Sequence, residues 1–173
     1  FILVSCHYYG YLYGKEEPEI KGIEVKRSSS SKYEAYFQTE LLNKVIQGNS
    51  KEIIEEWINK EQERIKTLPL EEIAFPCKIA NKKYEVYPIF VRAYDNTQRI
   101  KKDFKVNKGE RFYYIFVQNK EVLAFSQEDN TFVDRNLIDW NQVIERTMFN
   151  KAEKIFSAMK WIFKRNLNQL SLM

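Results

Sequence analysis

The chain has 173 residues, 44% of them apolar and 15% aromatic, so it can bury the core of one ordinary domain and is not disordered in bulk. Its two cysteines, Cys6 and Cys77, and its one histidine, His7, cannot form a four-ligand zinc site without carboxylates, which favours free thiols in a reducing compartment. The apolar start "FILVSC" lacks basic residues and is too short to span a bilayer, so we expect a soluble intracellular protein.

The net charge of +4 is unevenly distributed. Residues 76–111 hold ten Lys and Arg against four Asp and Glu, and residues 148–173 hold five against one. A basic central block and a basic tail indicate a polyanionic partner such as a nucleic acid. Alternatively, the two basic stretches are solvent-exposed surfaces without a bound partner, and the charge alone favours this simpler interpretation.

The first predicted element is an antiparallel β-hairpin from Tyr8 to Arg27. Both "HYYGYLYG" and "IKGIEVKR" have strand character, and "KEEPE" lies between them as a turn. Gly22 interrupts the second strand, which indicates a bulge or a place where another group approaches the backbone closely.

Two amphipathic helices are expected next. Ser28 to Ser31 offer an N-cap for the first helix, and Gly48 is placed to end it. Its apolar face consists of Tyr33, Phe37, Leu41 and Val45. Asn49 and Ser50 begin the second helix, and Pro69 is expected to end it. The apolar side of that helix consists of Ile53, Ile54, Trp57, Ile58 and Ile65.

The remaining elements mix short strands with helices. "IAFPCKI" is expected to be extended, and Pro88 is placed to begin a helix that continues through "KKDF". "RFYYIFVQNKEVLAF" predicts a hairpin with its turn at Gln118 to Lys120. Asp139 and Gln142 form a capping box for a last helix. That helix should bury Ile144, Met148, Ile155, Phe156 and Met159.

The sequence therefore predicts an α+β fold, with an N-terminal antiparallel β-hairpin followed by a mainly helical domain that contains a small β-hairpin. It contains no Gly-rich phosphate loop and no nucleophile elbow. The motif at Tyr94 to Asn96 has one carboxylate, whereas a two-metal site needs paired acids. These residues indicate a binding or structural module and not a complete enzyme.

Several segments resemble family B DNA polymerases. Lys21-Gly22-Ile23-Glu24 resembles the K-G-x-E strand at the end of that family's palm, and Ser28 to Ser30 resemble the step into its helical thumb. The serine version and the composition rich in Lys, Asn and Ile are similar to the phage and virus branch. Further resemblances follow in the family's order, at Leu68 to Pro76, Tyr87 to Ala93, Asn107 to Val117 and Ile138 to Trp161.

The chain departs from the family pattern at identifiable positions. His7 stands where the family has the lysine of a Lys-x-Tyr element, although Tyr9 matches its tyrosine. Ala152 replaces a usual proline, and Lys160 replaces a usual glycine. The catalytic aspartates and the fingers are absent, so the resemblance covers about the C-terminal fifth of a polymerase. Magnesium is therefore expected only in the missing catalytic part, with no cofactor and no catalytic residue in this chain.

The resemblance implies three regions: a palm-end hairpin at 1–27, a thumb at 28–163 and a tail at 164–173. A thumb holds primer-template duplex through phosphate contacts without reading bases. The residues expected to do so are Tyr9, Lys21, Gly22, Lys26, Arg27, Ser28, Ser29, Lys78, Lys82, Lys83, Arg92, Arg99, Lys101 and Lys102, the last three on one helix.

The tail "NQLSLM" resembles the start of a sliding-clamp peptide, with Gln169 and Leu172 as anchors, but the aromatic pair is missing. Further expected partners are primer-template DNA and a catalytic polymerase subunit, with no membrane partner. The alternatives are an unrelated α+β nucleic-acid-binding protein and a polymerase remnant without activity.

Overall fold

The computed structural model describes residues 2–4, 7–11, 14, 18–21, 29–78 and 86–165. These residues form a mixed α+β structure, which confirms the predicted fold class. The chain divides into two compact units. We call residues 1–27, 33–67 and 144–173 the bundle unit, and residues 28–32 and 68–143 the sheet unit. In the part of the chain that the structure describes, no helix is long and apolar enough to cross a membrane.

The bundle unit begins with a three-stranded antiparallel sheet. Its strands are β1 (Ile2–Val4), β2 (His7–Tyr11) and β3 (Pro18–Lys21), in the order β1-β2-β3. The β2–β3 pairing, with Tyr9 opposite Ile20, confirms a hairpin in this region. Strand β3 begins at Pro18, inside the predicted turn, and residues 22–27 of the predicted second strand lie outside the described residues. Strand β1 was not predicted, although its apolar, partly β-branched sequence suits a strand that pairs with β2.

Two long helices follow the predicted pattern. Helix α1 (Lys32–Ile46) buries Tyr33, Phe37, Leu41 and Val45, as the spacing predicted. Gly48 follows α1 with φ of +79°, a conformation that glycine adopts without strain. Ser50 is the N-cap of helix α2 (Lys51–Ile65), and its side chain accepts a hydrogen bond from the Ile53 backbone N–H at 3.5 Å.

Two predictions for α2 were wrong. Ile53 is 53% exposed, because the buried row of α2 follows Ile54, Ile58 and Ile65 and leaves Ile53 beside it. The helix also ends at Ile65 and not at Pro69. Pro69 instead caps a short helix, α3 (Leu70–Ile73), that the sequence analysis missed.

The last helical stretch runs without a break from Trp140 to Ala158. It comprises α5 (Trp140–Ile144), the π-helical turn η3 (Glu145–Phe149) and α6 (Asn150–Ala158). Asp139 Oδ1 accepts a hydrogen bond from the Gln142 N–H at 3.0 Å, which confirms the predicted cap. The predicted apolar residues are buried except Met159, which is partly exposed because it lies just beyond the end of α6.

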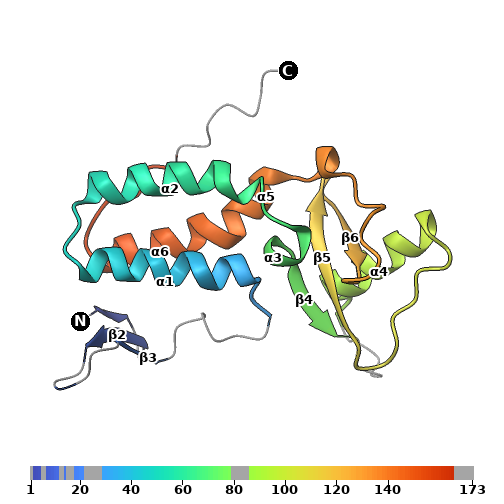
Figure 1. Cartoon of the computed structure of the whole chain (residues 1–173), viewed down its shortest axis with the longest axis horizontal. Helices are drawn as coiled ribbons and strands as arrows, with labels where there is room; N and C mark the ends of the chain where they lie inside the picture. Colours follow the sequence, from blue (N-terminus) through green and yellow to red (C-terminus); the bar gives the residue numbers. More distant parts are fainter. Residues whose placement is uncertain are drawn as a thin grey trace. The chain divides into compact units, whose positions relative to one another are not determined.

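Helices α1, α2 and α6 lie side by side in the bundle unit (Figure 1). Phe37 of α1 stacks on Trp57 of α2, with 5.1 Å between ring centroids. Glu34 of α1 and Lys151 of α6 form an ion pair at 2.8 Å, and both side chains are largely buried. Buried charges need this kind of pairing, so the ion pair fixes which faces of α1 and α6 meet.

A left-handed residue ends α6. Lys160 has φ of +58°, its N–H donates to the Ser157 carbonyl, and the Trp161 N–H donates to the Phe156 carbonyl at 2.8 Å. The Trp161 ring also packs edge-on against Phe156. This is a Schellman motif, in which glycine is the usual left-handed residue. A glycine would adopt this backbone conformation without strain, whereas Lys160 keeps its Cβ atom there.

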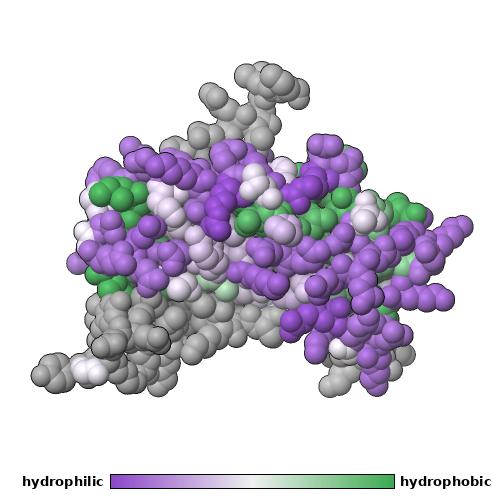
Figure 2. All heavy atoms as spheres, viewed as in Figure 1, coloured by the Kyte–Doolittle hydropathy of each residue, from purple (hydrophilic) through white to green (hydrophobic). Residues whose placement is uncertain are grey.

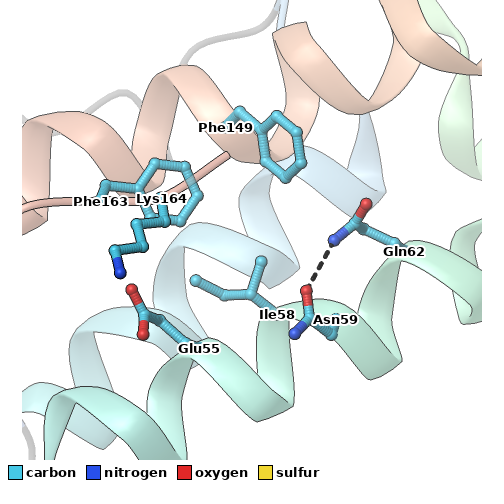
Figure 3. A pocket seen from close by; sticks show the side chains of 7 residues that line it. All are labelled: Glu55, Ile58, Asn59, Gln62, Phe149, Phe163 and Lys164. Carbon is cyan, nitrogen blue, oxygen red and sulfur yellow. Dashed lines mark hydrogen bonds between the residues drawn. The ribbon is translucent and has the colours of Figure 1, made fainter. Parts of the chain in front are cut away.

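The chain then returns across the bundle. Phe163 packs edge-on against Phe149 and Phe156, at centroid distances of 5.5 and 5.0 Å. Phe163 also lines a cavity of about 10 Å³, about the volume that one water molecule occupies (Figure 3). Its other lining residues are Glu55, Ile58, Asn59, Gln62, Phe149 and Lys164. Rings from η3, α6 and the segment after α6 thus pack together in the bundle unit.

The sheet unit contains the second antiparallel sheet. Its strands are β4 (Phe75–Lys78), β5 (Arg111–Val117) and β6 (Glu121–Phe125), in the order β4-β5-β6. The β5–β6 hairpin turns at Asn119 and Lys120, both with φ near +60°, as in a type I′ turn. The prediction of this hairpin and its turn is thus confirmed. A 3-10 turn, η2 (Arg135–Leu137), follows before α5.

Helix α4 (Ile89–Ile100) packs on strands β5 and β6. The hydroxyl of Thr97 is buried between them, where it donates to the Ala124 carbonyl at 2.9 Å and accepts from the Ala124 N–H at 2.8 Å. Pro88 is the N-cap of α4, so the helix begins at Ile89, one position after the predicted start. The helix ends at Ile100, so Lys101 and Lys102 follow it and do not lie on it as predicted. The chain turns back there because Phe104 is buried and its carbonyl accepts from the Gln98 side chain.

Candidate nucleic-acid interface

Two cations face each other at one end of the second sheet. Lys78 ends β4, Arg111 begins β5, and the antiparallel register places them directly opposite one another. Both residues are exposed, and among the described residues neither has an ion-pair or hydrogen-bond partner for its side chain. Like charges in this arrangement repel each other, so an anion bound between them would stabilise the pair.

A groove of about 340 Å³ adjoins this pair, entirely within the sheet unit. The described residues that line it are Ser29, Pro76, Cys77, Lys78, Phe90, Arg111 and Tyr114. The groove thus combines two cations, a hydroxyl and two partly exposed aromatic side chains. That combination can bind a ligand that has both an anionic and a flat apolar part.

Contacts within the sheet hold the Tyr114 ring in place. Tyr114 stacks on Phe75 at 5.3 Å between centroids and packs edge-on against Phe116 at 5.9 Å. A ring held by two others loses little freedom when a ligand binds against it. Tyr114 therefore offers a preorganised surface within the groove.

The Cys77 thiol in the groove is neutral at ordinary pH. Its burial raises its pKa to about 12, and the Sγ donates to the Phe112 carbonyl at 3.6 Å. A neutral thiol is a poor nucleophile and a poor metal ligand. In the described part of the chain, no three His, Cys, Asp or Glu side chains are grouped so that they could hold a metal ion.

A second basic group lies on and after α4. Arg92 and Arg99 are seven residues apart, which places them on one helix face, and both are exposed together with Lys102. Arg92 also donates to the Lys120 carbonyl at 3.4 Å, which orients its guanidinium across the β5–β6 turn. Figure 2 shows a mostly hydrophilic surface over α4 and the segment after it.

Lys101 has a different role from its neighbours. Its ammonium group pairs with Asp129 at 2.9 Å and lies 5.4 Å from the centre of the Phe132 ring. The hydrogen bond that the Lys101 ammonium donates to the Asp129 carboxylate raises the pKa of Lys101. These contacts join the segment after α4 to the loop after β6, so the Lys101 side chain is engaged within the fold.

The other predicted site residues have less structural description. Tyr9 and Lys21 lie on the paired strands β2 and β3, where the structure describes the backbone alone. Eight more lie outside the described residues: Gly22, Lys26, Arg27, Ser28, Lys82, Lys83, Gln169 and Leu172. Their assignments stay predictions.

The sequence analysis missed Arg111, Phe90 and Tyr114 as site residues. Arg111 was counted only as the last cation of the basic block. Its position opposite Lys78 depends on strand register, which requires knowing that "FPCK" pairs with "RFYY". The β-strand character of both segments was the available signal.

Comparisons with known proteins identify a fold. No family model matches the chain, and no curated protein matches it. Among solved structures, the chain is similar to the family B DNA polymerase from the hyperthermophilic archaeon Pyrobaculum calidifontis, with a TM-score of 0.70 and 17% sequence identity. The match covers 95% of this chain and 22% of that polymerase. The chain thus has the fold of a region of a family B DNA polymerase and spans about a fifth of that protein's length.

Proposed function

We propose that this chain is a thumb-like domain that holds primer-template duplex for a DNA-directed DNA polymerase during replication. The observation that carries the proposal is the fold match over 95% of the chain to part of a family B polymerase. The ordered resemblances, from Lys21-Gly22-Ile23-Glu24 to the last helix, support it independently. The chain is proposed to be non-catalytic by itself.

The proposed binding mode relies on phosphate contacts. Arg92, Arg99 and Lys102 form an exposed basic row, and Lys78 lies in the same unit. Such contacts suit a protein that must hold any sequence and move along it, because each one is modest and weakened by salt. Further contacts are assigned to Tyr9, Lys21, Gly22, Lys26, Arg27, Ser28, Ser29, Lys82, Lys83 and Lys101.

The proposed partners follow from the same role. A catalytic polymerase subunit would supply the catalytic aspartates, and magnesium would bind there. Gln169 and Leu172 would contact a sliding clamp. The proposed setting is the interior of a microbial host cell, with a phage or virus as the source of the gene.

The test is the affinity of the purified chain for a primer-template hairpin and for blunt duplex of the same length, measured over a salt series. We expect tighter binding to the hairpin and a steep loss of affinity for both as salt rises. Equal binding to both DNAs would favour the unrelated α+β nucleic-acid-binding protein. A folded chain that binds no DNA would contradict the proposal and favour a remnant.

A further inference from the structure

We propose that the groove beside Lys78 and Arg111 binds one unpaired nucleotide of a DNA strand. The inference rests on the proposed function, because it takes DNA as the partner. It goes beyond that function by assigning this groove, which contains the proposed duplex contacts Lys78 and Ser29, to an unpaired nucleotide as well.

The cationic end of the groove suits a backbone phosphate. Lys78 and Arg111 stand opposite each other without an acidic partner among the described residues. A phosphate between them would offset their repulsion and accept charge-assisted hydrogen bonds from both. The exposed Ser29, which also lines the groove, carries a hydroxyl that can donate to the same group.

The aromatic side chains of Phe90 and Tyr114 favour a single strand over a duplex as the ligand of the groove. In a duplex the base faces are stacked on one another, so a protein meets phosphates, sugars and base edges. Phe90 and Tyr114 line the same groove as the two cations, and a phosphate contact needs neither ring. Aromatic rings next to cations are typical of sites that stack unpaired bases.

The size and charge of the groove agree with this occupant. Its volume of about 340 Å³ lies at the lower end of the range for small-molecule sites, roughly 300–1,000 Å³. A duplex is too wide to enter it, whereas one nucleotide is not. The raised pKa of Cys77 keeps its thiol uncharged, so no thiolate in the groove repels a phosphate.

The experiment compares a short fluorescent oligothymidylate with a blunt duplex, each titrated with the full chain. Phe90→Leu should weaken oligothymidylate binding roughly tenfold, because one stacking contact is lost. Tyr114→Leu should act likewise, whereas Tyr114→Phe keeps the ring and should retain the affinity. Lys120→Gln is the matched control, because Lys120 is an exposed cation in the turn at the other end of β5. It should leave oligothymidylate binding unchanged.

Arg111→Gln separates a binding role of Arg111 from a structural one, because loss of a structural contact would lower stability together with binding. It should weaken oligothymidylate binding and at the same time raise the urea midpoint slightly, because Lys78 then loses a repulsive neighbour. Inorganic phosphate, added as a competitor, should displace the oligonucleotide only weakly, since it lacks the base.

The outcomes separate this inference from the proposed function. If Phe90→Leu and Arg111→Gln bind oligothymidylate as tightly as the parent chain, the groove assignment is overturned, and duplex binding can still stand. Displacement by phosphate as effectively as by free oligothymidylate would show that the groove binds anions without a base, which also overturns it. If the parent chain binds neither duplex nor oligothymidylate, both proposals are wrong.

Discussion

Lys78 and Arg111 occupy directly opposed positions on β4 and β5, so the sheet places two positive charges side by side. This pair gives the first prediction. Lys78→Glu converts the repulsion into attraction and should stabilise the chain by about 0.5–1 kcal/mol, measured by urea unfolding. The same change should weaken DNA binding. Arg111→Glu pairs a glutamate on β5 with Lys78 on β4, and it should likewise stabilise the chain and weaken DNA binding. A loss of stability in both variants would contradict the assigned register.

The basic face of α4 gives the second prediction. Arg92→Gln combined with Arg99→Gln should reduce the steepness of the slope of log affinity against log salt concentration by about 1–2. The reason is that for each lost phosphate contact, one counterion stays on the DNA. Binding of a labelled duplex at several salt concentrations measures this slope. Lys60→Gln with Lys66→Gln removes the same charge from an exposed position on α2 and a partly exposed one just after it, and should leave the slope nearly unchanged. Equal changes in the two variants would mean that only net charge matters.

The third prediction concerns the buried ion pair of Glu34 and Lys151. Lys151→Met leaves a buried carboxylate without its cation and should destabilise the chain by about 3–5 kcal/mol. Glu34→Leu should cost a similar amount, whereas the double variant should recover most of the loss. Urea unfolding of all four proteins completes the thermodynamic cycle. Additive single losses would show that the two groups are not coupled.

The fourth prediction concerns the left-handed backbone at Lys160. Lys160→Gly removes the steric cost of a side chain at positive φ and should raise the free energy of unfolding by about 0.5–1 kcal/mol. Lys160→Ala removes the charge but keeps the Cβ atom, so it should give no such gain. If alanine stabilised the chain as much as glycine, the effect would come from charge.

The fifth prediction uses the pKa of Cys77. Its value of about 12 in the folded chain means that the thiol should react with iodoacetamide at pH 8 at least roughly a hundredfold more slowly than a free thiol. The raised pKa also stabilises the fold below about pH 9, and this contribution is lost as the pH rises toward 12. Alkylation of a Cys6→Ser variant, with and without urea, measures the difference. Fast alkylation of the folded chain would contradict the burial of Cys77.

The helices were predictable where an apolar face repeats over several turns. Tyr33, Phe37, Leu41 and Val45 define the buried face of α1 because only one helical orientation covers all four. The error at Ile53 arose because two adjacent isoleucines cannot both lie at the centre of one face. The sequence does not say which of the two a neighbouring helix will cover.

The candidate site was less predictable because it depends on pairing between distant segments. The turn between β5 and β6 is local, and its position was predicted from Gln118 to Lys120. The pairing of β4 with β5 joins segments more than thirty residues apart, as the contact of Cys77 with Phe112 shows. Ser29, Lys78 and Arg111 therefore come together through tertiary structure, and no local spacing marks them as one site.

The order of the two units along the chain has a consequence for synthesis on the ribosome. The hydroxyl of Tyr33 lies 3.9 Å from the sulfur of Met148, and these residues are 115 positions apart. Helices α1 and α2 are thus translated long before the helical stretch that completes their core. All three strands of the second sheet, in contrast, lie within residues 68–143, between α2 and that last helical stretch. The nascent bundle must keep its apolar faces exposed until residues 144–158 have been translated, a period in which chaperones can bind them. A chain truncated before residue 144 should therefore aggregate. The β4-β5-β6 sheet, by contrast, can assemble as soon as its strands have been translated.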